Sequence, residues 1–90
     1  DAKEKLAIDN RSAYLKVIEA HKQIGIARTS VEEAEENLRI HTEQYQTGTI
    51  TISELLDAET LNRKAHDQLS SSVADYQIRL ADYQRKVSAN

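Results

Sequence analysis

Apolar and small residues recur through the first half of this sequence at alternating steps of three and four. Bulky positions fall seven residues apart from Val17 to Tyr45, and alanines fall seven apart from Ala13 to Ala34. Such a heptad repeat predicts a long α-helix with one stripe that packs against another helix. The stripe consists of Leu6, Ala13, Val17, Ala20, Ile24, Ala27, Val31, Ala34, Leu38, His41 and Tyr45, with Asn10 in its one gap.

A matching stripe follows in the second half, and the two together predict an all-α fold, a long antiparallel two-helix hairpin with coiled-coil-like packing. Folding back would pair positions that sum to roughly one hundred. The second stripe consists of Leu55, Ala58, Leu61 or Asn62, Ala65, Leu69, Ser72, Tyr76, Leu80, Tyr83 and Val87. The register places Ala34 beside Ala65, Val31 beside Leu69, Ile24 beside Tyr76 and Val17 beside Tyr83.

The reversal is predicted in the stretch "YQTGTITISELLDA", which holds one of only two glycines in a chain without proline. Gly48 can adopt the positive φ that a helix C-terminal cap requires. Thr51 and Glu54 form a Thr-x-x-Glu capping box, which starts a new helix, and Ile50 and Leu55 flank it as a hydrophobic staple. We therefore expect helices over about 2–46 and 52–88, with a tip at 47–51, in a single hairpin over 1–90 that is a piece of a larger protein.

Composition limits the function. The formal charge of −3 is spread over both halves, so a nucleic-acid partner is not expected. The chain has no cysteine, and His21, His41 and His66 lack the spacing of a metal motif such as His-Glu-x-x-His, so we expect no metal site. Without a nucleophile beside a base or a cofactor motif, we expect neither an enzyme nor a cofactor.

Several apolar residues lie off the main stripes and predict a second contact face. Because the alanine-rich seam is thin, we expect the isolated chain to be weakly stable or to self-associate through that face. Gly25, inside the first helix, either gives room to Tyr76 or marks a bend. The off-stripe residues are Ile8, Leu15, Ile18, Ile26, Ile40, Ile52, Leu56 and Ile78.

Nearly the whole chain resembles a helical hairpin of the TolC-like outer-membrane efflux channel family. The tip pattern Tyr-x-x-Gly-Thr-x-Thr followed by Leu-Leu-Asp-Ala is much rarer than heptads alone, and "AEENLRIHTEQY" before it fits as well. The matching positions are Tyr45, Gly48, Thr49, Thr51, Leu55, Leu56, Asp57, Ala58, Leu61, Ala65, Leu69, Asp75, Tyr76 and Leu80.

This resemblance implies an assembly and a location. Members are homotrimers of Gram-negative bacteria whose hairpins form an α-helical barrel, the periplasmic tunnel below a membrane β-barrel. Hairpin tips form the tunnel entrance and meet the hairpin tips of a periplasmic adaptor protein, which links the channel to an inner-membrane pump that exports drugs, metals or other small molecules. The chain would supply tunnel wall and docking tip.

The resemblance also assigns residues. Gly48, Thr49, Ile50 and Thr51 fall where channel tips meet the adaptor, while Glu54 and Asp57 match paired acids that ring the entrance. Ile50 departs from the family, because a basic residue at the corresponding tip position helps to close the entrance through charged contacts. The acids also have a purely structural interpretation, in which Glu54 is a cap and Asp57 favours the helix dipole.

Two other functions remain open. The chain could be the hairpin of an adaptor, but aligning Ser53 with the serine of the adaptor motif Arg-x-x-x-Leu-x-x-x-x-x-x-Ser puts Thr42 and Gln46 at its other two positions. The motif is therefore absent. A generic antiparallel coiled-coil interaction module would explain the heptads but not the Gly-Thr tip with its following Leu-Leu-Asp-Ala.

Overall fold

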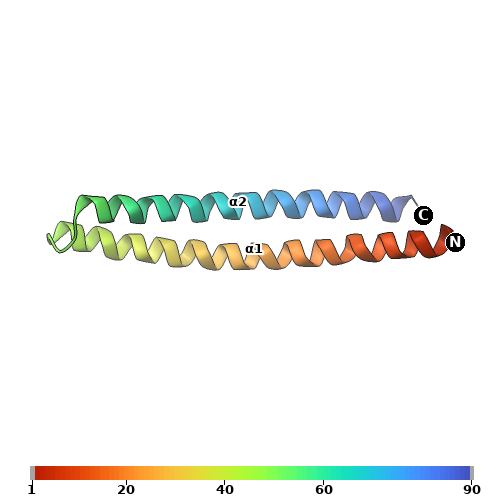
Figure 1. The fold of residues 1–90 in the computed structure, drawn as a ribbon, viewed down its shortest axis with the longest axis horizontal. Coiled ribbons are helices and arrows are strands. Elements are labelled where there is room, and N and C mark those ends of the chain that lie inside the picture. The colour runs from red at the N-terminus through yellow and green to blue at the C-terminus, as the bar shows by residue number, and fades with distance from the viewer. Residues whose placement is uncertain (1, 90) are drawn as a thin grey trace. The chain divides into compact units, whose positions relative to one another are not determined.

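The computed structural model describes residues 2–89, which form two α-helices and no strand. α1 spans Ala2–Gln46 and α2 spans Ile52–Ser88, and the chain reverses between them (Figure 1). The fold is therefore the all-α antiparallel hairpin that the two stripes predict, and the helix bounds coincide with the predicted ranges 2–46 and 52–88. Over residues 2–89, neither helix carries a stretch apolar enough to cross a membrane.

The hairpin divides into two compact units. The tip unit comprises Ile26–Ser70, with the end of α1, the turn and the start of α2. The terminal unit comprises the chain up to Gly25 and from Ser71 onward. Each unit has its own core, built from one stretch of each stripe.

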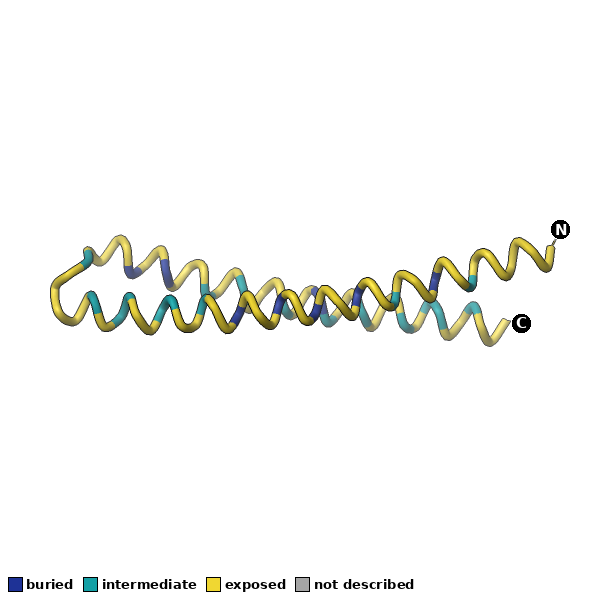
Figure 2. The backbone as a smooth tube through the Cα atoms, turned by 90° about the horizontal axis from the view of Figure 1, so that it is seen from below, coloured by how far each residue is buried: buried dark blue, intermediate teal, exposed yellow. Residues whose placement is uncertain are grey.

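The core of the tip unit combines small and bulky side chains. Ala27, Val31, Leu55 and Ala58 are buried, and half-buried stripe residues continue the seam on both helices (Figure 2). An interhelical contact between Glu35 and His66 conforms to the predicted register to within one turn. The half-buried stripe residues of this unit are Ala34, Leu38, His41, Asn62, Ala65 and Leu69.

The terminal unit combines buried small residues with aromatic contacts. Ala13, Ala20, Ile24 and Ser72 are buried. The rings of Tyr14 and Tyr83 lie 5.7 Å apart between centroids, and those of His21 and Tyr76 lie 5.7 Å apart in an edge-on arrangement. Both pairs join residues that lie within one turn of the predicted register.

Some stripe positions differ from the prediction. Asn62 rather than Leu61 occupies the seam, because Leu61 is 55% exposed while the Asn62 side-chain oxygen is buried. Leu6 is 46% exposed although it belongs to the predicted stripe. At the other extremes of the seam, Tyr45 and Val87 are also exposed.

Gly25 lies on an exposed part of α1. A Cβ built on it would meet nothing within 4 Å, so the suggestion that Gly25 makes room for Tyr76 is wrong.

Candidate functional site

The end of α1 is closed by a Schellman motif at the hairpin tip. The Thr49 amide donates to the Gln44 carbonyl at 2.8 Å, and the Gly48 amide donates to the Tyr45 carbonyl at 3.0 Å. Gly48 has a φ of 79°, which is the left-handed conformation that this motif requires at its C′ position. The Gly48 prediction is thus confirmed, and the backbone at the end of α1 is held by paired hydrogen bonds.

The start of α2 is fixed by the predicted capping box. The Glu54 amide donates to the Thr51 hydroxyl at 3.2 Å, and the Thr51 amide donates to the Glu54 carboxylate at 3.3 Å. Leu55 is buried and Ile50 half-buried, as expected for the two ends of a hydrophobic staple. Two caps therefore enclose a turn of only a few residues, which limits the conformations available to the tip.

The tip residues differ in accessibility. Gly48, Thr49 and Thr51 are exposed, whereas Ile50 folds partly back against the hairpin. The Thr49 hydroxyl lies 3.0 Å from the Thr47 hydroxyl, which in turn donates to the Gln44 carbonyl. Gly48, Thr49 and Thr51 thus form the accessible surface of the tip, whereas Ile50 contributes to packing as well.

Glu54 and Asp57 lie three residues apart on α2 and are both exposed. One Glu54 oxygen accepts the Thr51 amide, so Glu54 does cap the helix. Its other oxygen is not needed for the capping box and can face solvent or a ligand. The structure brings the two acids to the same helical face within one copy of the chain.

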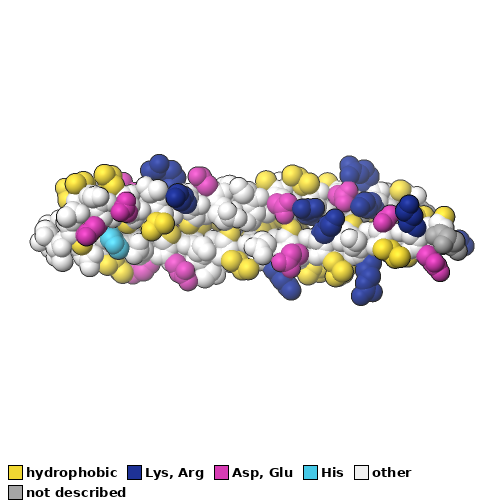
Figure 3. All heavy atoms as spheres, in the orientation of Figure 1, with side chains coloured by type: hydrophobic (Ala, Val, Ile, Leu, Met, Phe, Trp, Pro, Cys, Tyr) yellow, Lys and Arg dark blue, Asp and Glu magenta, His cyan; other side chains and the backbone are white. Residues whose placement is uncertain are grey.

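Two apolar side chains beside the tip extend this surface. Ile52 and Leu56, one helical turn apart on α2, are 50% and 52% exposed. In Figure 3, hydrophobic side chains gather over the first turns of α2. From the sequence, both residues were placed off the stripe but were not connected to the tip. Their four-residue spacing beside the capping box could have indicated that they lie on one helical face next to it.

The tip unit is strongly acidic. Arg39 donates to Glu36 at 2.6 Å and to Glu43 at 2.7 Å, and the hydrogen bond from this guanidinium lowers the pKa of the Glu36 carboxyl below its ordinary value. The same contacts raise the pKa of Arg39. The formal charge of the whole tip unit is −5. It has nine acids (Glu32, Glu33, Glu35, Glu36, Glu43, Glu54, Asp57, Glu59 and Asp67) and four bases (Arg28, Arg39, Arg63 and Lys64).

The three histidines have separate surroundings. His21 contacts the Tyr76 ring, His41 Nδ1 lies 2.8 Å from the Asn37 carbonyl, and His66 Nε2 lies 3.0 Å from the Glu35 carboxylate. Within residues 2–89, no three histidine, aspartate or glutamate side chains are grouped as a metal ion would need.

Comparisons with models of protein families, with curated proteins and with solved structures found no match.

Proposed function

We propose that this chain is a periplasmic hairpin of a TolC-like efflux channel in the outer membrane of a Gram-negative bacterium. Its helices would form part of the wall of a homotrimeric tunnel, and its tip would dock the hairpin of a periplasmic adaptor that recruits an inner-membrane pump. The observation that carries the proposal is the Gly-Thr tip, with Gly48 and Thr49 exposed between two caps and Leu-Leu-Asp-Ala following.

The tip geometry supports a docking role. A Cβ at Gly48 would meet nothing within 4 Å, so the space above this backbone is open to a partner. The Schellman motif and the capping box hold the turn before any partner arrives, which reduces the entropy lost on binding. Thr49 offers a hydroxyl and a methyl group, and neither carries a charge that a docked partner would have to desolvate.

The helix surfaces support a role as tunnel wall. Side chains such as Ile26, Ile52 and Ile78 are at least half exposed, although their burial against other helices would be favourable. In a barrel, neighbouring hairpins would cover such residues. Glu54 and Asp57 would then face their counterparts from the other subunits at the entrance, where repelling carboxylates attract cations.

A charged substitution at the tip tests docking. Thr49→Arg leaves both caps in place, yet it would bury an unpaired charge in the adaptor interface. We expect the full-length channel carrying it to fold and assemble but to bind adaptor at least ~10-fold more weakly. Thr60→Arg makes the same change on an exposed part of α2 away from the tip and should leave adaptor binding unchanged.

The readouts are adaptor binding by the purified channel and substrate export by cells. If Thr49→Arg channels assemble, bind adaptor and export as well as the Thr60→Arg control, the tip is not the docking site.

A further inference from the structure

The division between the two compact units falls where both helices carry weak helix formers. On α1 it follows Gly25, and on α2 it lies between Ser70 and Ser71, inside a run of three serines. Glycine is the weakest helix former apart from proline, and serine side chains compete with the helix for backbone hydrogen bonds. Glycine and serine pairs are among the few causes of sharp bends in long helices.

The weak points of the two helices lie at one level of the terminal unit. The rings of His21 and Tyr76 contact each other across this unit. The residue numbers 21 and 76 add up to 97, as do 25 and 72, so the same register places Gly25 level with Ser72. A bend at this level therefore meets a weak helix former in both helices at once.

Side chains at this level oppose bending only weakly. Gly25 is exposed, and a Cβ built on it would meet nothing within 4 Å. Ser72 is buried, but its short polar side chain removes far less apolar area from water than a leucine or valine would. Ile24 is also buried, so the two helices remain paired beside this thin layer.

We propose that the hairpin has a hinge at the level of Gly25 and Ser72, at which the tip unit tilts against the terminal unit while each unit keeps its own core. The 21 residues from Gly25 to the end of α1 span about 30 Å, so a tilt of about 10° displaces the tip by about 5 Å. Because the Schellman motif and the capping box hold the turn, the tip moves as one body. The hinge belongs to the hairpin itself and does not depend on the docking role proposed above.

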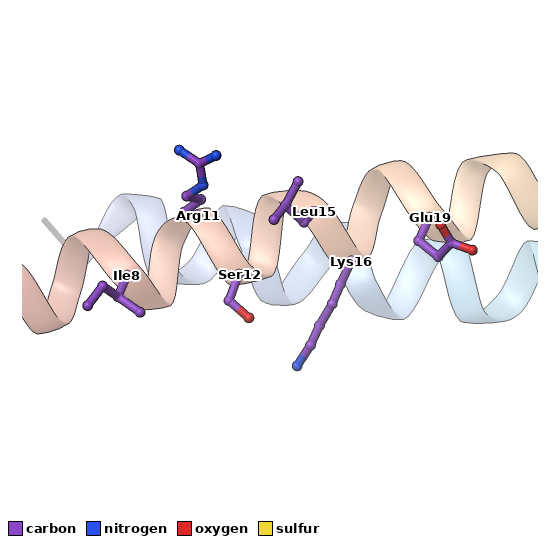
Figure 4. Close-up of a pocket in the computed structure, with 6 residues that line it drawn as sticks. All are labelled: Ile8, Arg11, Ser12, Leu15, Lys16 and Glu19. Carbon is purple, nitrogen blue, oxygen red and sulfur yellow. The ribbon is translucent and has the colours of Figure 1, made fainter.

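Distance measurements between spin labels test the hinge, because the chain has no cysteine of its own. Ser12→Cys and Glu33→Cys place labels three heptads apart on one face of α1, one in each unit. Both positions are exposed, and Ser12 projects from α1 beside a shallow surface depression (Figure 4), so neither label displaces a core side chain. Glu32→Cys with Gln46→Cys is the matched pair inside the tip unit.

Pulsed electron double resonance gives the distance distribution of each pair in the 90-residue chain. Excess unlabelled chain suppresses distances between molecules, and circular dichroism checks that each labelled chain is helical. We expect a wider distribution for the pair that spans the hinge than for the pair inside the tip unit. Equal widths would mean that the hairpin bends no more at this level than within a unit, and would refute the inference.

Moving the glycine tests whether Gly25 is the cause. Gly25→Ala should narrow the distribution of the spanning pair. It should also slow hydrogen exchange of the amides of residues 27–29 roughly 5-fold, through the difference in helix propensity between glycine and alanine. These amides are not adjacent to the substitution, so their intrinsic exchange rates stay the same.

The control variant combines Gly25→Ala with Ala81→Gly, which restores the glycine at an exposed position of α2 within the terminal unit. Its distribution should stay narrow and its exchange slow, because the hinge no longer contains glycine. If this variant instead regains the width and exchange rates of the natural chain, the motion follows overall stability rather than Gly25, and the hinge assignment is wrong.

Discussion

Thr51 and Glu54 cap each other at the start of α2. The hydroxyl of Thr51 accepts the Glu54 amide at 3.2 Å, and the carboxylate of Glu54 accepts the Thr51 amide at 3.3 Å. The pair thus fixes where α2 begins. Glu54, one of the two acids proposed to ring the channel entrance, is therefore also part of the helix cap.

Removing the Thr51 hydroxyl should destabilise the hairpin. Thr51→Ala leaves a helix N-terminal amide without its acceptor and should cost about 1 kcal/mol. For a domain of this size, that loss lowers Tm by about 4–8 °C. Thermal unfolding followed by circular dichroism measures the shift, and Thr51→Ser, which keeps the hydroxyl, should remain close to the natural chain. Equal losses in both variants would mean that the hydroxyl is not the stabilising group.

The two glycines should respond to alanine in opposite directions. Gly48 has a φ of 79°, so Gly48→Ala places a side chain in the left-handed region and should cost about 1–2 kcal/mol. Gly25 lies in a helix with open space around it, so Gly25→Ala should stabilise the monomeric hairpin by up to about 1 kcal/mol. Chemical denaturation at low protein concentration compares them, and a destabilising Gly25→Ala would contradict the open space found there.

Asn62 should be replaceable with a gain in stability. Its side-chain oxygen is buried and accepts no hydrogen bond from the protein, which is unfavourable in a seam. Asn62→Leu removes that group, adds apolar contact and should stabilise the hairpin by about 1 kcal/mol. The exposed neighbour provides the control, because Leu61→Gln should change the free energy of unfolding by less than about 0.5 kcal/mol. If Leu61→Gln changed the free energy of unfolding more than Asn62→Leu did, Leu61 rather than Asn62 would lie in the seam.

Acid should weaken two surface ion pairs. Hydrogen bonds from Arg39 and Arg85 lower the pKa values of Glu36 and Asp82, respectively, below their ordinary values of 4.5 and 3.8. A carboxyl group with a depressed folded-state pKa stabilises the fold above its unfolded value, and this contribution is lost as pH falls through the folded value. Helicity should therefore decline below about pH 4.5, modestly, because both pairs are exposed.

Carboxyl NMR titration isolates each pair. Arg39→Ala should return the pKa of Glu36 toward 4.5 while leaving Asp82 unchanged, and Arg85→Ala should do the converse. A Glu36 pKa that does not rise in Arg39→Ala would show that this guanidinium is not the cause.

The acids beside the tip should affect ion passage rather than docking. In the full-length channel, Glu54→Gln with Asp57→Asn removes both charges, and glutamine can still serve in a capping box. We expect weaker block by multivalent cations in planar-bilayer recordings, with adaptor binding unchanged. Unaltered block would mean that these carboxylates do not line the entrance.

The sequence alone determined the fold and the position of the turn. The heptads from Ala13 and Val17 onward, the positive-φ requirement at Gly48 and the Thr51 capping box are local signals, and the hydrogen bonds that realise them span at most five residues. Such signals can be read without knowing what lies across the hairpin. The family resemblance also came from the sequence, and it leaves the functional assignment as a proposal.

Only the tertiary structure decided which residues face the partner helix and which face solvent. The heptad pattern allowed either Leu61 or Asn62 in the seam, and the register across the hairpin selected Asn62. Similarly, the sequence could not distinguish a Gly25 that accommodates Tyr76 from one with open space beside it. The physical reason is that helical spacing fixes a residue's angle on its own helix, whereas burial depends on where the opposing helix lies.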